Sequence, residues 1–228
     1  MIEVSKGVHD FHTHTFLSDG ALSPMEQARR AVVNGYLTLG LTDHMGVGGV
    51  AALLDGLRRD RELIERHWPI TVVVGVELTH VPAEAIHEAA AHALSEGAEI
   101  IVVHGETPVE PVPEGTNHAS IACGLVDILA HPGFLTEDDA RLAAANDVYL
   151  EITARRGHSL TNGHVARLAQ MSGARMIVNS DAHDPSDLLK PSFQQSVALG
   201  AGIPRDLLNE ILNNNPTRLR ERTLHRRI

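Results

Sequence analysis

Short runs of Val, Ile and Leu recur along the chain, separated by longer segments in which apolar residues have helical spacing. The runs are four to seven residues long and lack a regular alternation of apolar and polar residues, which is typical of parallel strands buried on both faces. The predicted strands are Val8–His12, Leu37–Thr42, Ile70–Val76, Ile100–Val103, Val126–Ala130, Val148–Ile152 and Met176–Asn179. Because each strand is followed by a helix or a loop, we predict right-handed βαβ units and a mostly parallel α/β sheet.

Helix boundaries are marked by residues that favour the ends of helices. Ser23 followed by Pro24 predicts a helix start, and Gly35 predicts the end of that helix. Thr136 begins the segment TEDDARLAAA, whose acidic residues lie in the first turn, where the helix dipole favours them. The other predicted helices are Ala83–Ser95 after Pro82, Gly163–Met171 after Asn162, and Arg205–Leu212 after Pro204. No linker or change of composition divides the chain, so we expect residues 1–228 to form a single domain.

Composition and charge exclude several classes of protein. The chain has 228 residues, of which 15 are His, and its formal net charge of −10 argues against a protein that holds nucleic acid by a basic face. The five arginines within Arg218–Ile228 could form a phosphate-binding tail, but a solvated terminal helix is favoured, because no aromatic residue lies among them. The single cysteine, Cys123, excludes a disulfide scaffold and a Cys-rich zinc finger. No signal peptide or membrane-spanning segment is recognisable, so we expect a cytoplasmic protein.

Every predicted strand ends in, or is closely followed by, a residue that can bind a metal ion. In chain order these residues are His12, His14, Asp19, Asp43, His44, Glu77, His104, His131, Glu151, Asp181 and His183. In a parallel barrel the carboxyl ends of the strands converge on one face, where active sites are built. We therefore predict one site that combines imidazole and carboxylate ligands, a mixture that suits Zn, Mn or Fe without choosing among them.

The strand ends also carry recognisable motifs in a fixed order. They are HTH at 12–14, Asp19, TDH at 42–44, GVE at 75–77, His104 in VHGE, HPG at 131–133 and SDAH at 180–183. This set, which extends from about Val8 to His183, resembles the PHP family of polymerase and histidinol phosphatase domains. The resemblance implies a single-domain, distorted (β/α)7 TIM-like barrel with two to three divalent metal ions at the C-terminal strand ends. Nine ligand positions define the family's full cluster, and this sequence fills all of them: His12, His14, Asp19, His44, Glu77, His104, His131, Asp181 and His183.

The resemblance further implies how the ligands are shared. The implied sets are His12, His14 and Glu77 for a first ion, Glu77, His104 and His131 for a second, and Asp19, His44 and His183 for a third. Asp181 would face the first ion or bridge two ions, and it is counted with Glu77 and His183 as catalytic. Outside the nine, Glu151 and Asp43 are expected to accept hydrogen bonds from ligand imidazoles.

Three loops near these strand ends remain open to two interpretations. After the sixth strand, Arg155, Arg156 and His158 either bind a substrate phosphate, which guanidinium groups match well, or belong to a solvated basic loop. Thr107–Gly115 contains three prolines and either forms a wall of the pocket or merely connects two elements. Gly46–Gly49 lacks the Lys-Ser/Thr of a P-loop, so a lid or a plain turn is predicted there.

These features predict an enzyme that hydrolyses a small phosphomonoester. By resemblance to the stand-alone histidinol-phosphate phosphatases, a metal-bound hydroxide would attack phosphorus directly, with no covalent enzyme intermediate. The expected partner is a small phosphorylated substrate. Neither a membrane nor long nucleic acid is expected as a partner, and the oligomeric state is left open.

Three other functions are weighed against this prediction. A nucleotide phosphatase or 3′–5′ exonuclease would use the same trinuclear site. An amidohydrolase also begins with HxH on a barrel strand, but it usually places a Lys at a middle strand end, and none of these strand ends has one. A non-catalytic metal-binding module would be expected to have lost ligands, whereas this sequence retains the full set.

Overall fold

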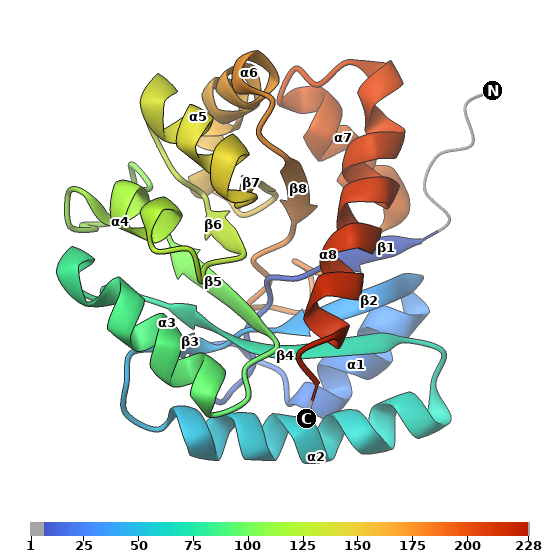
Figure 1. Cartoon of the computed structure of the whole chain (residues 1–228). Coiled ribbons are helices and arrows are strands. Elements are labelled where there is room, and N and C mark those ends of the chain that lie inside the picture. The colour runs from blue at the N-terminus through green and yellow to red at the C-terminus, as the bar shows by residue number, and fades with distance from the viewer. Residues whose placement is uncertain (1–6, 228) are drawn as a thin grey trace.

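The computed structural model describes residues 7–227 and is built around a sheet of parallel strands. Seven of the strands follow one another in the order β1-β2-β4-β5-β6-β7-β8 and form a nearly closed barrel (Figure 1). They are β1 (Val8–Asp10), β2 (Tyr36–Leu41), β4 (Thr71–Leu78), β5 (Ile100–His104), β6 (Ile128–Ala130), β7 (Tyr149–Thr153) and β8 (Met176–Asn179). A two-residue strand, β3 (His44–Met45), pairs with the end of β4. The predicted barrel is therefore confirmed, and every predicted strand is present with its ends shifted by at most a few residues.

The barrel closes between β1 and β8 through the segments that follow these strands. Thr13 forms an isolated parallel bridge with Ala182, and the His14 amide donates to the Ala182 carbonyl at 2.9 Å. Below this bridge, the Phe11 amide donates to Asn179 Oδ1 at 2.9 Å. Because closure uses these two segments, the HTH and SDAH motifs lie side by side at the C-terminal end of the barrel.

Helices pack around the barrel and connect its strands. They are α1 (Pro24–Val33), α2 (Val50–His67), α3 (Ile86–Ser95), α4 (Thr116–Ala122), α5 (Glu137–Asn146), α6 (Asn162–Ser172), α7 (Pro191–Gly200) and α8 (Asn215–Leu224). The predicted helix starts at Ser23 and Thr136 are confirmed, because their hydroxyls accept hydrogen bonds from the amides of Glu26 and Asp139. None of the sequence signals locates α2, α4 or α7. No helix within residues 7–227 has the length and apolar character needed to cross a membrane.

The segment after Pro204 differs most from its prediction. Instead of one α-helix over Arg205–Leu212, it forms a 3-10 turn at Arg205–Leu207 and a π-helical turn at Glu210–Asn214, which runs directly into α8. Leu219 of α8 is fully buried in the apolar cluster inside the barrel. Phe11, which follows β1, and residues of the strands β4 to β8 complete that cluster. The strand residues are Val73, Ile100, Val102, Ile128, Ala130, Tyr149 and Ile177.

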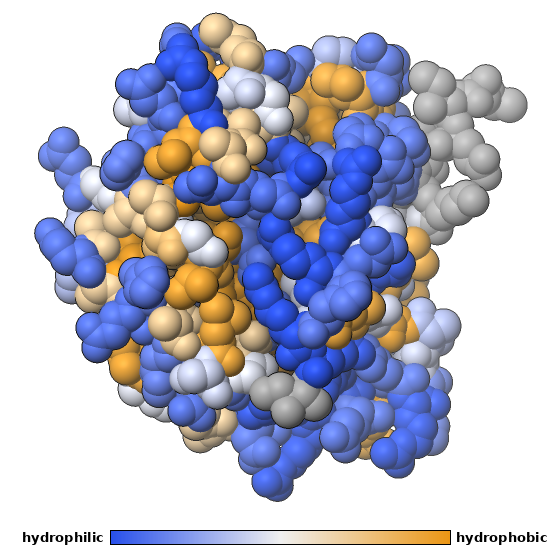
Figure 2. All heavy atoms as spheres, in the orientation of Figure 1, coloured by the Kyte–Doolittle hydropathy of each residue, from blue (hydrophilic) through white to orange (hydrophobic). Residues whose placement is uncertain are grey.

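The arginines in α8 and just after it also differ from the expectation of a solvated helix. Figure 2 shows hydrophilic residues gathered along α8 on the surface, but several arginine side chains in this segment reach acidic residues, of which Asp127 is buried and Glu65 is partly exposed. Arg226 Nη1 lies 2.6 Å from Asp127 Oδ2, and Arg222 Nη2 lies 3.0 Å from Asp127 Oδ1. Arg227 Nη2 lies 2.9 Å from Glu65 Oε1. The C-terminal segment therefore belongs to the folded structure: Leu219 packs inside the barrel, and the arginines pair with Asp127 and Glu65.

Candidate active site

A polar cavity of about 390 Å³ opens at the C-terminal ends of the strands. Residues of the loops after nearly all the strands line it, and each has a polar or charged side chain. They are Ser18, Asp19, His44, Thr79, His80, His104, Glu110, His131, Arg155, His158, Asp181 and His183. His12, His14 and Glu77 lie beneath, almost completely shielded from solvent. The barrel therefore brings together all nine residues that the family resemblance implies.

The deepest part of the cluster combines imidazoles with two carboxylates. His12 Nε2 lies 3.3 Å from Glu77 Oε1, and His14 Nε2 lies 3.2 Å from Asp181 Oδ1. His131 Nε2 lies 3.6 Å from both Glu77 Oε1 and Asp181 Oδ2. Three sets have ligand atoms within 4.8 Å of one another: His12, His14 and Asp181; His12, Glu77 and His131; and His131, His158 and Asp181. These sets share members, as expected of ions that share bridging ligands.

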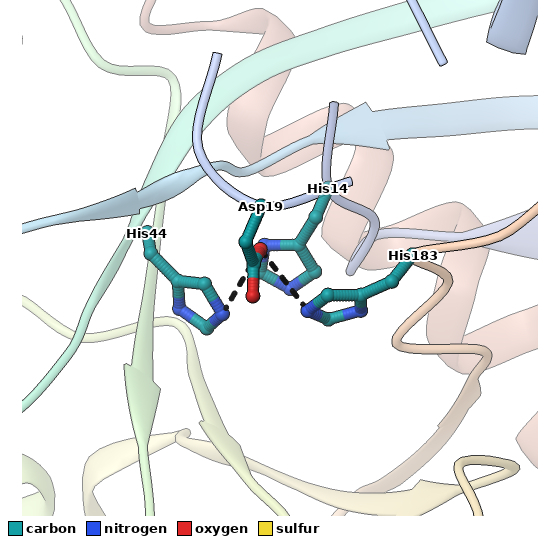
Figure 3. A group of neighbouring side chains, drawn as sticks. All are labelled: His14, Asp19, His44 and His183. Atoms are coloured by element: carbon teal, nitrogen blue, oxygen red, sulfur yellow. Dashed lines mark ion pairs between the residues drawn. The ribbon is translucent and has the colours of Figure 1, made fainter. Parts of the chain in front are cut away.

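A second group of candidate ligands, drawn in Figure 3, is more exposed to solvent than the first. Asp19 Oδ1 lies 3.2 Å from His183 Nε2 and 3.6 Å from His44 Nε2. His14 completes the group, and its ring stacks on that of His44 with centroids 4.1 Å apart. Asp19, His44 and His183 are the residues that the resemblance implies for a third ion.

Buried ligand atoms without hydrogen-bond partners test whether this arrangement fits metal ions. Within residues 7–227, His12 Nε2, both ring nitrogens of His14, and the Nδ1 atoms of His131 and His158 are buried and make no hydrogen bond. Burying an unpaired polar atom costs roughly 1–3 kcal/mol, so a fold rarely collects several in one place. Divalent cations would pair with these atoms and with the neighbouring carboxylates, so the donor set fits.

The pKa shifts in the cluster have identifiable physical causes. Burial lowers the pKa of His14 and His131 well below the usual range, which favours the neutral imidazole that binds metals. Burial acts in the same direction on His12, but the carboxylates of Glu77, Glu151 and Asp181 outweigh it and raise the pKa of His12 well above normal. Burial also raises the pKa of Asp181 well above its usual range. A bound cation would favour the ionised form of this carboxyl group and so act against the effect of burial.

Glu151 and Asp43 support the cluster in different ways. Glu151 Oε1 lies 2.8 Å from His12 Nδ1, and Glu151 Oε2 accepts a hydrogen bond from the His131 amide at 3.0 Å. These contacts are the ones needed for a residue that orients ligand imidazoles. Asp43 instead accepts from the Thr15 amide and the Ser18 hydroxyl, both at 2.7 Å. Asp43 thereby orders the loop that carries Asp19. The predicted hydrogen bond from the His44 imidazole to the Asp43 carboxylate is not formed.

His44 is held by other groups, which the sequence gives no signal for. Its Nδ1 atom lies 2.6 Å from Thr79 Oγ1 and 2.7 Å from Glu77 Oε2. The short strand β3 places it there, since His44 is level with Glu77 in the β3–β4 pairing.

The loop after β7 separates the three residues that were grouped as candidate phosphate contacts. Arg155 lines the cavity, and its Nη1 donates to the Asp181 carbonyl at 3.1 Å and lies 2.6 Å from His183 Nδ1. Arg156 is exposed and is not part of the lining. His158 is 4 % exposed and points into the cluster, and its pKa is lowered to about 4, mainly by burial.

The proline-containing loop Thr107–Gly115 contributes a wall of the cavity through Glu110. Glu110 Oε2 lies 2.9 Å from His104 Nε2, and Glu110 Oε1 lies 3.3 Å from His158 Nε2. A single carboxylate among prolines has no motif around it, so no sequence signal points to Glu110. His80 also lies outside the predicted set of site residues, yet it lines the cavity with its ring centroid 5.4 Å from that of His104.

Backbone strain is concentrated at the same site. His80, His131 and Asp181 have φ angles of 53°, 27° and 54°, in a region that residues other than glycine rarely adopt. Such conformations cost about 1–3 kcal/mol each and persist where the surrounding structure holds them, frequently at functional sites. The strain turns His131 and Asp181 into the cavity instead of continuing their strands.

Comparisons with known proteins agree with this geometry. The family model described as the PHP domain matches residues 10–103. An uncharacterized protein of Methanocaldococcus jannaschii is 44% identical over 214 residues, covering 93% of this chain and 98% of the relative. A protein of Thermoanaerobacter sp. named "Probable phosphatase" is 27% identical over 233 residues, covering 95% and 94% of the two chains.

Solved structures show the same fold at low sequence identity. The structure named "putative histidinol phosphatase" from Listeria monocytogenes has a TM-score of 0.58 at 11% identity, covering 79% of this chain and 97% of that one. Ochratoxinase from A. niger has a TM-score of 0.63 at 12% identity, covering 94% and 71%. The fold alone therefore does not separate phosphatases from other barrel hydrolases. The family match, together with the relatives above, shows that this chain belongs to the PHP domain family.

Proposed function

We propose that this protein is a phosphatase that hydrolyses a small phosphomonoester with the help of two to three divalent metal ions. The observation that carries the proposal is the set of buried, unpaired imidazole nitrogens around Glu77 and Asp181. The first ion would be held by His12, His14, Glu77 and Asp181, the second by Glu77, His104 and His131, and the third by Asp19, His44 and His183. Bound ions of this kind activate water and stabilise the oxygens of a transferring phosphoryl group.

The charges that line the cavity explain why an anionic substrate requires those ions. Asp19, Glu110 and Asp181 contribute carboxylates to the wall, Glu77 lies beneath, and Arg155 is the one Lys or Arg side chain that the described lining contains. A phosphate group entering this cavity without cations would meet a surplus of negative charge. With cations in place the surplus is neutralised.

Arg155 is the side chain best placed to orient the phosphate. Its guanidinium group is about one-third exposed at the cavity and is anchored by the Asp181 carbonyl. A guanidinium group offers several donors in a plane that matches phosphate oxygens. Arg155 would therefore hold the phosphoryl group beside the ligand cluster, whereas exposed Arg156 would contribute little.

The size and polarity of the cavity favour a small, polar ester. Its volume is about 390 Å³ and its lining contains no apolar side chain from residues 7–227, so the leaving group would be recognised by hydrogen bonds and charge. Histidinol phosphate is the first candidate, since the Listeria structure carries that name. A nucleotide or an oligonucleotide end is the second, because a 5′-3′ exoribonuclease of Haemophilus influenzae is 32% identical over 80 residues, or 35% of this chain.

A metal analysis joined to a phosphoester panel tests the proposal. Metal-free protein would be loaded with Zn, Mn or Fe, and phosphate release would be measured from histidinol phosphate, sugar phosphates, mononucleotides and short oligonucleotides. We expect two to three ions per chain and release from at least one small monoester. Release from nucleotides or oligonucleotides alone would favour the second candidate, and no release with any loaded metal would refute the phosphatase.

Reaction in ¹⁸O-labelled water tests direct hydrolysis. Attack of water on phosphorus places the label in the released phosphate, whereas attack on carbon places it in the alcohol. We expect label in phosphate, and no phosphorylated enzyme intermediate in a rapid-quench experiment.

A further inference from the structure

His104 and His158 face the same part of the cavity, but their ring nitrogens have different partners. His104 Nε2 lies 2.9 Å from Glu110 Oε2, and His104 Nδ1 lies 3.2 Å from the Gly105 carbonyl. Both nitrogens of His104 are therefore engaged. His158 Nε2 lies 3.3 Å from Glu110 Oε1, within ion-pair distance, while its Nδ1 is buried without a hydrogen bond.

The same contrast appears in the spacing of the ligand atoms. His158 forms a compact set with His131 and Asp181, all three within 4.8 Å, and its ring centroid lies 4.4 Å from that of His131. His104 belongs to no such set among residues 7–227. The nine-residue cluster implied by the family resemblance includes His104 and leaves out His158.

Local backbone geometry brings His158 and Glu110 together. Gly157 has a φ of 88°, which turns the chain so that His158 enters the cavity. A side-chain carbon at Gly157 would lie 3.5 Å from Val109 Cγ1, so the loop after β7 packs against the loop that carries Glu110. The pairing of these two residues is thus a consequence of how the loops meet.

We propose that His158 is a ligand of the metal ion shared with His131 and Asp181, bound through Nδ1, and that Glu110 orients its ring by accepting a hydrogen bond from Nε2. This inference rests on the proposed metal-dependent function. A carboxylate behind a ligand imidazole fixes the ring and its tautomer, and loss of such a carboxylate typically weakens metal binding about 10–100-fold. The loop Thr107–Gly115 would therefore act on the metal site through Glu110, without itself supplying a ligand.

Metal binding, measured independently of activity, tests this assignment. Metal-free full-length protein would be titrated with Co²⁺ by calorimetry and by visible absorption, and bound ions would be counted by mass spectrometry. We expect His158→Gln to lose one ion or to bind it at least ~100-fold more weakly, with a changed Co²⁺ spectrum, and Glu110→Gln to weaken the same ion about tenfold. His87→Gln, which changes an exposed histidine on α3, is the matched control and should behave as the wild type.

The outcomes separate this inference from the proposed function. Wild-type ion number, affinity and spectrum in both His158→Gln and Glu110→Gln would overturn the assignment, and a raised KM in the same variants would make His158 a substrate contact. If the wild type binds its ions and His158→Gln loses one, the assignment stands even when no phosphoester is hydrolysed. A wild type that binds no ion would overturn both proposals. Glu110 is half-exposed, so its variant remains informative if His158→Gln fails to fold.

Discussion

Buried carboxylates lie at both ends of the barrel, but the two ends give them different partners. At the N-terminal end, Asp127 and Glu99 are almost fully buried and contact arginines: Asp127 pairs with Arg222 and Arg226, and Glu99 with Arg61. At the C-terminal end, Glu77 and Asp181 are equally buried among imidazoles.

The carboxylates at the N-terminal end therefore contribute to stability, whereas those at the C-terminal end contribute to the proposed function. Arginine is always charged, so a carboxylate beside it is neutralised by the protein itself. Imidazoles are neutral or charged according to their surroundings, and several here retain unpaired nitrogens. At the N-terminal end the buried carboxylates are paired with arginines, although Arg222 and Arg227 keep some nitrogens without a hydrogen bond. At the C-terminal end the unpaired atoms belong to imidazoles and a carboxylate, which are the groups that bind metal ions. The unpaired atoms at the C-terminal end cost stability, and the packing of the rest of the barrel offsets this cost.

Replacing Glu77 with Gln should have the largest effect and should act mainly on function. The amide keeps the shape but loses the charge that would bridge two ions, so we expect loss of bound metal and a fall in kcat/KM of about 10³-fold or more. Burial is outweighed by His12 and His44, which hold the pKa of Glu77 well below its usual range. The carboxylate therefore also stabilises the metal-free fold, and the metal-free variant should unfold at the same or a lower denaturant concentration than metal-free wild type. Glu88→Gln, on the exposed face of α3, is the control. Retention of full activity and metal would contradict the bridging role.

Replacing Asp127 with Asn should lower stability and leave metal binding and activity unchanged. Arg222 and Arg226 would lose their shared carboxylate, and breaking such a pair costs up to about 3–5 kcal/mol when both partners are buried. Because these arginines are about 30 % exposed, we expect a loss of about 2 kcal/mol in the free energy of unfolding, measured by urea denaturation. Metal content and KM should remain those of the wild type. A changed ion count would show that the two ends are not independent.

The pH dependence of stability should show a smaller effect from His9, which lies on β1 between the two ends. Burial, with a contribution from Arg220, lowers the pKa of His9 from 6.5 to about 4. Below pH 6.5 the unfolded chain therefore takes up a proton that the folded chain does not, and stability falls as the pH falls towards 4. From pH 7.5 to 5.5 this group should remove about 1 kcal/mol.

The His9 effect is measured as a difference between two proteins. Urea denaturation of metal-free wild type and His9→Gln at both pH values cancels the contributions of the other histidines. The wild type should lose more stability than the variant over this range. Equal losses in the two proteins would show that His9 titrates normally in the folded state.

Much of the architecture follows from local patterns in the chain. Buried parallel strands are short apolar runs, and helix ends carry residues such as Ser23 and Thr136, whose hydroxyls accept from backbone amides within the next turn. These are interactions between neighbours in sequence, so the sequence reveals them. The start of the long helix α2 could not be predicted in this way, because Gly49 precedes it and offers no side-chain cap.

The candidate site was predictable as a set of residues but not as a set of contacts. Ligand types at successive strand ends identify His12, Glu77 and the rest, because any parallel barrel brings those ends together. Asp43 shows where this reasoning stops. Its neighbour in sequence is His44, but its hydrogen bonds go to Thr15 and Ser18, on a loop more than twenty residues earlier.

By itself, then, the sequence determined the barrel, the face that carries the chemistry and the ligand types found there. Only the tertiary structure decided which ligand atoms are left unpaired, that Glu110 meets both His104 and His158, and that α8 closes the far end with Leu219 and its arginines. The physical reason is that these contacts join segments far apart in the chain. Their distances depend on how whole loops and helices pack, and no local spacing of residue types encodes them.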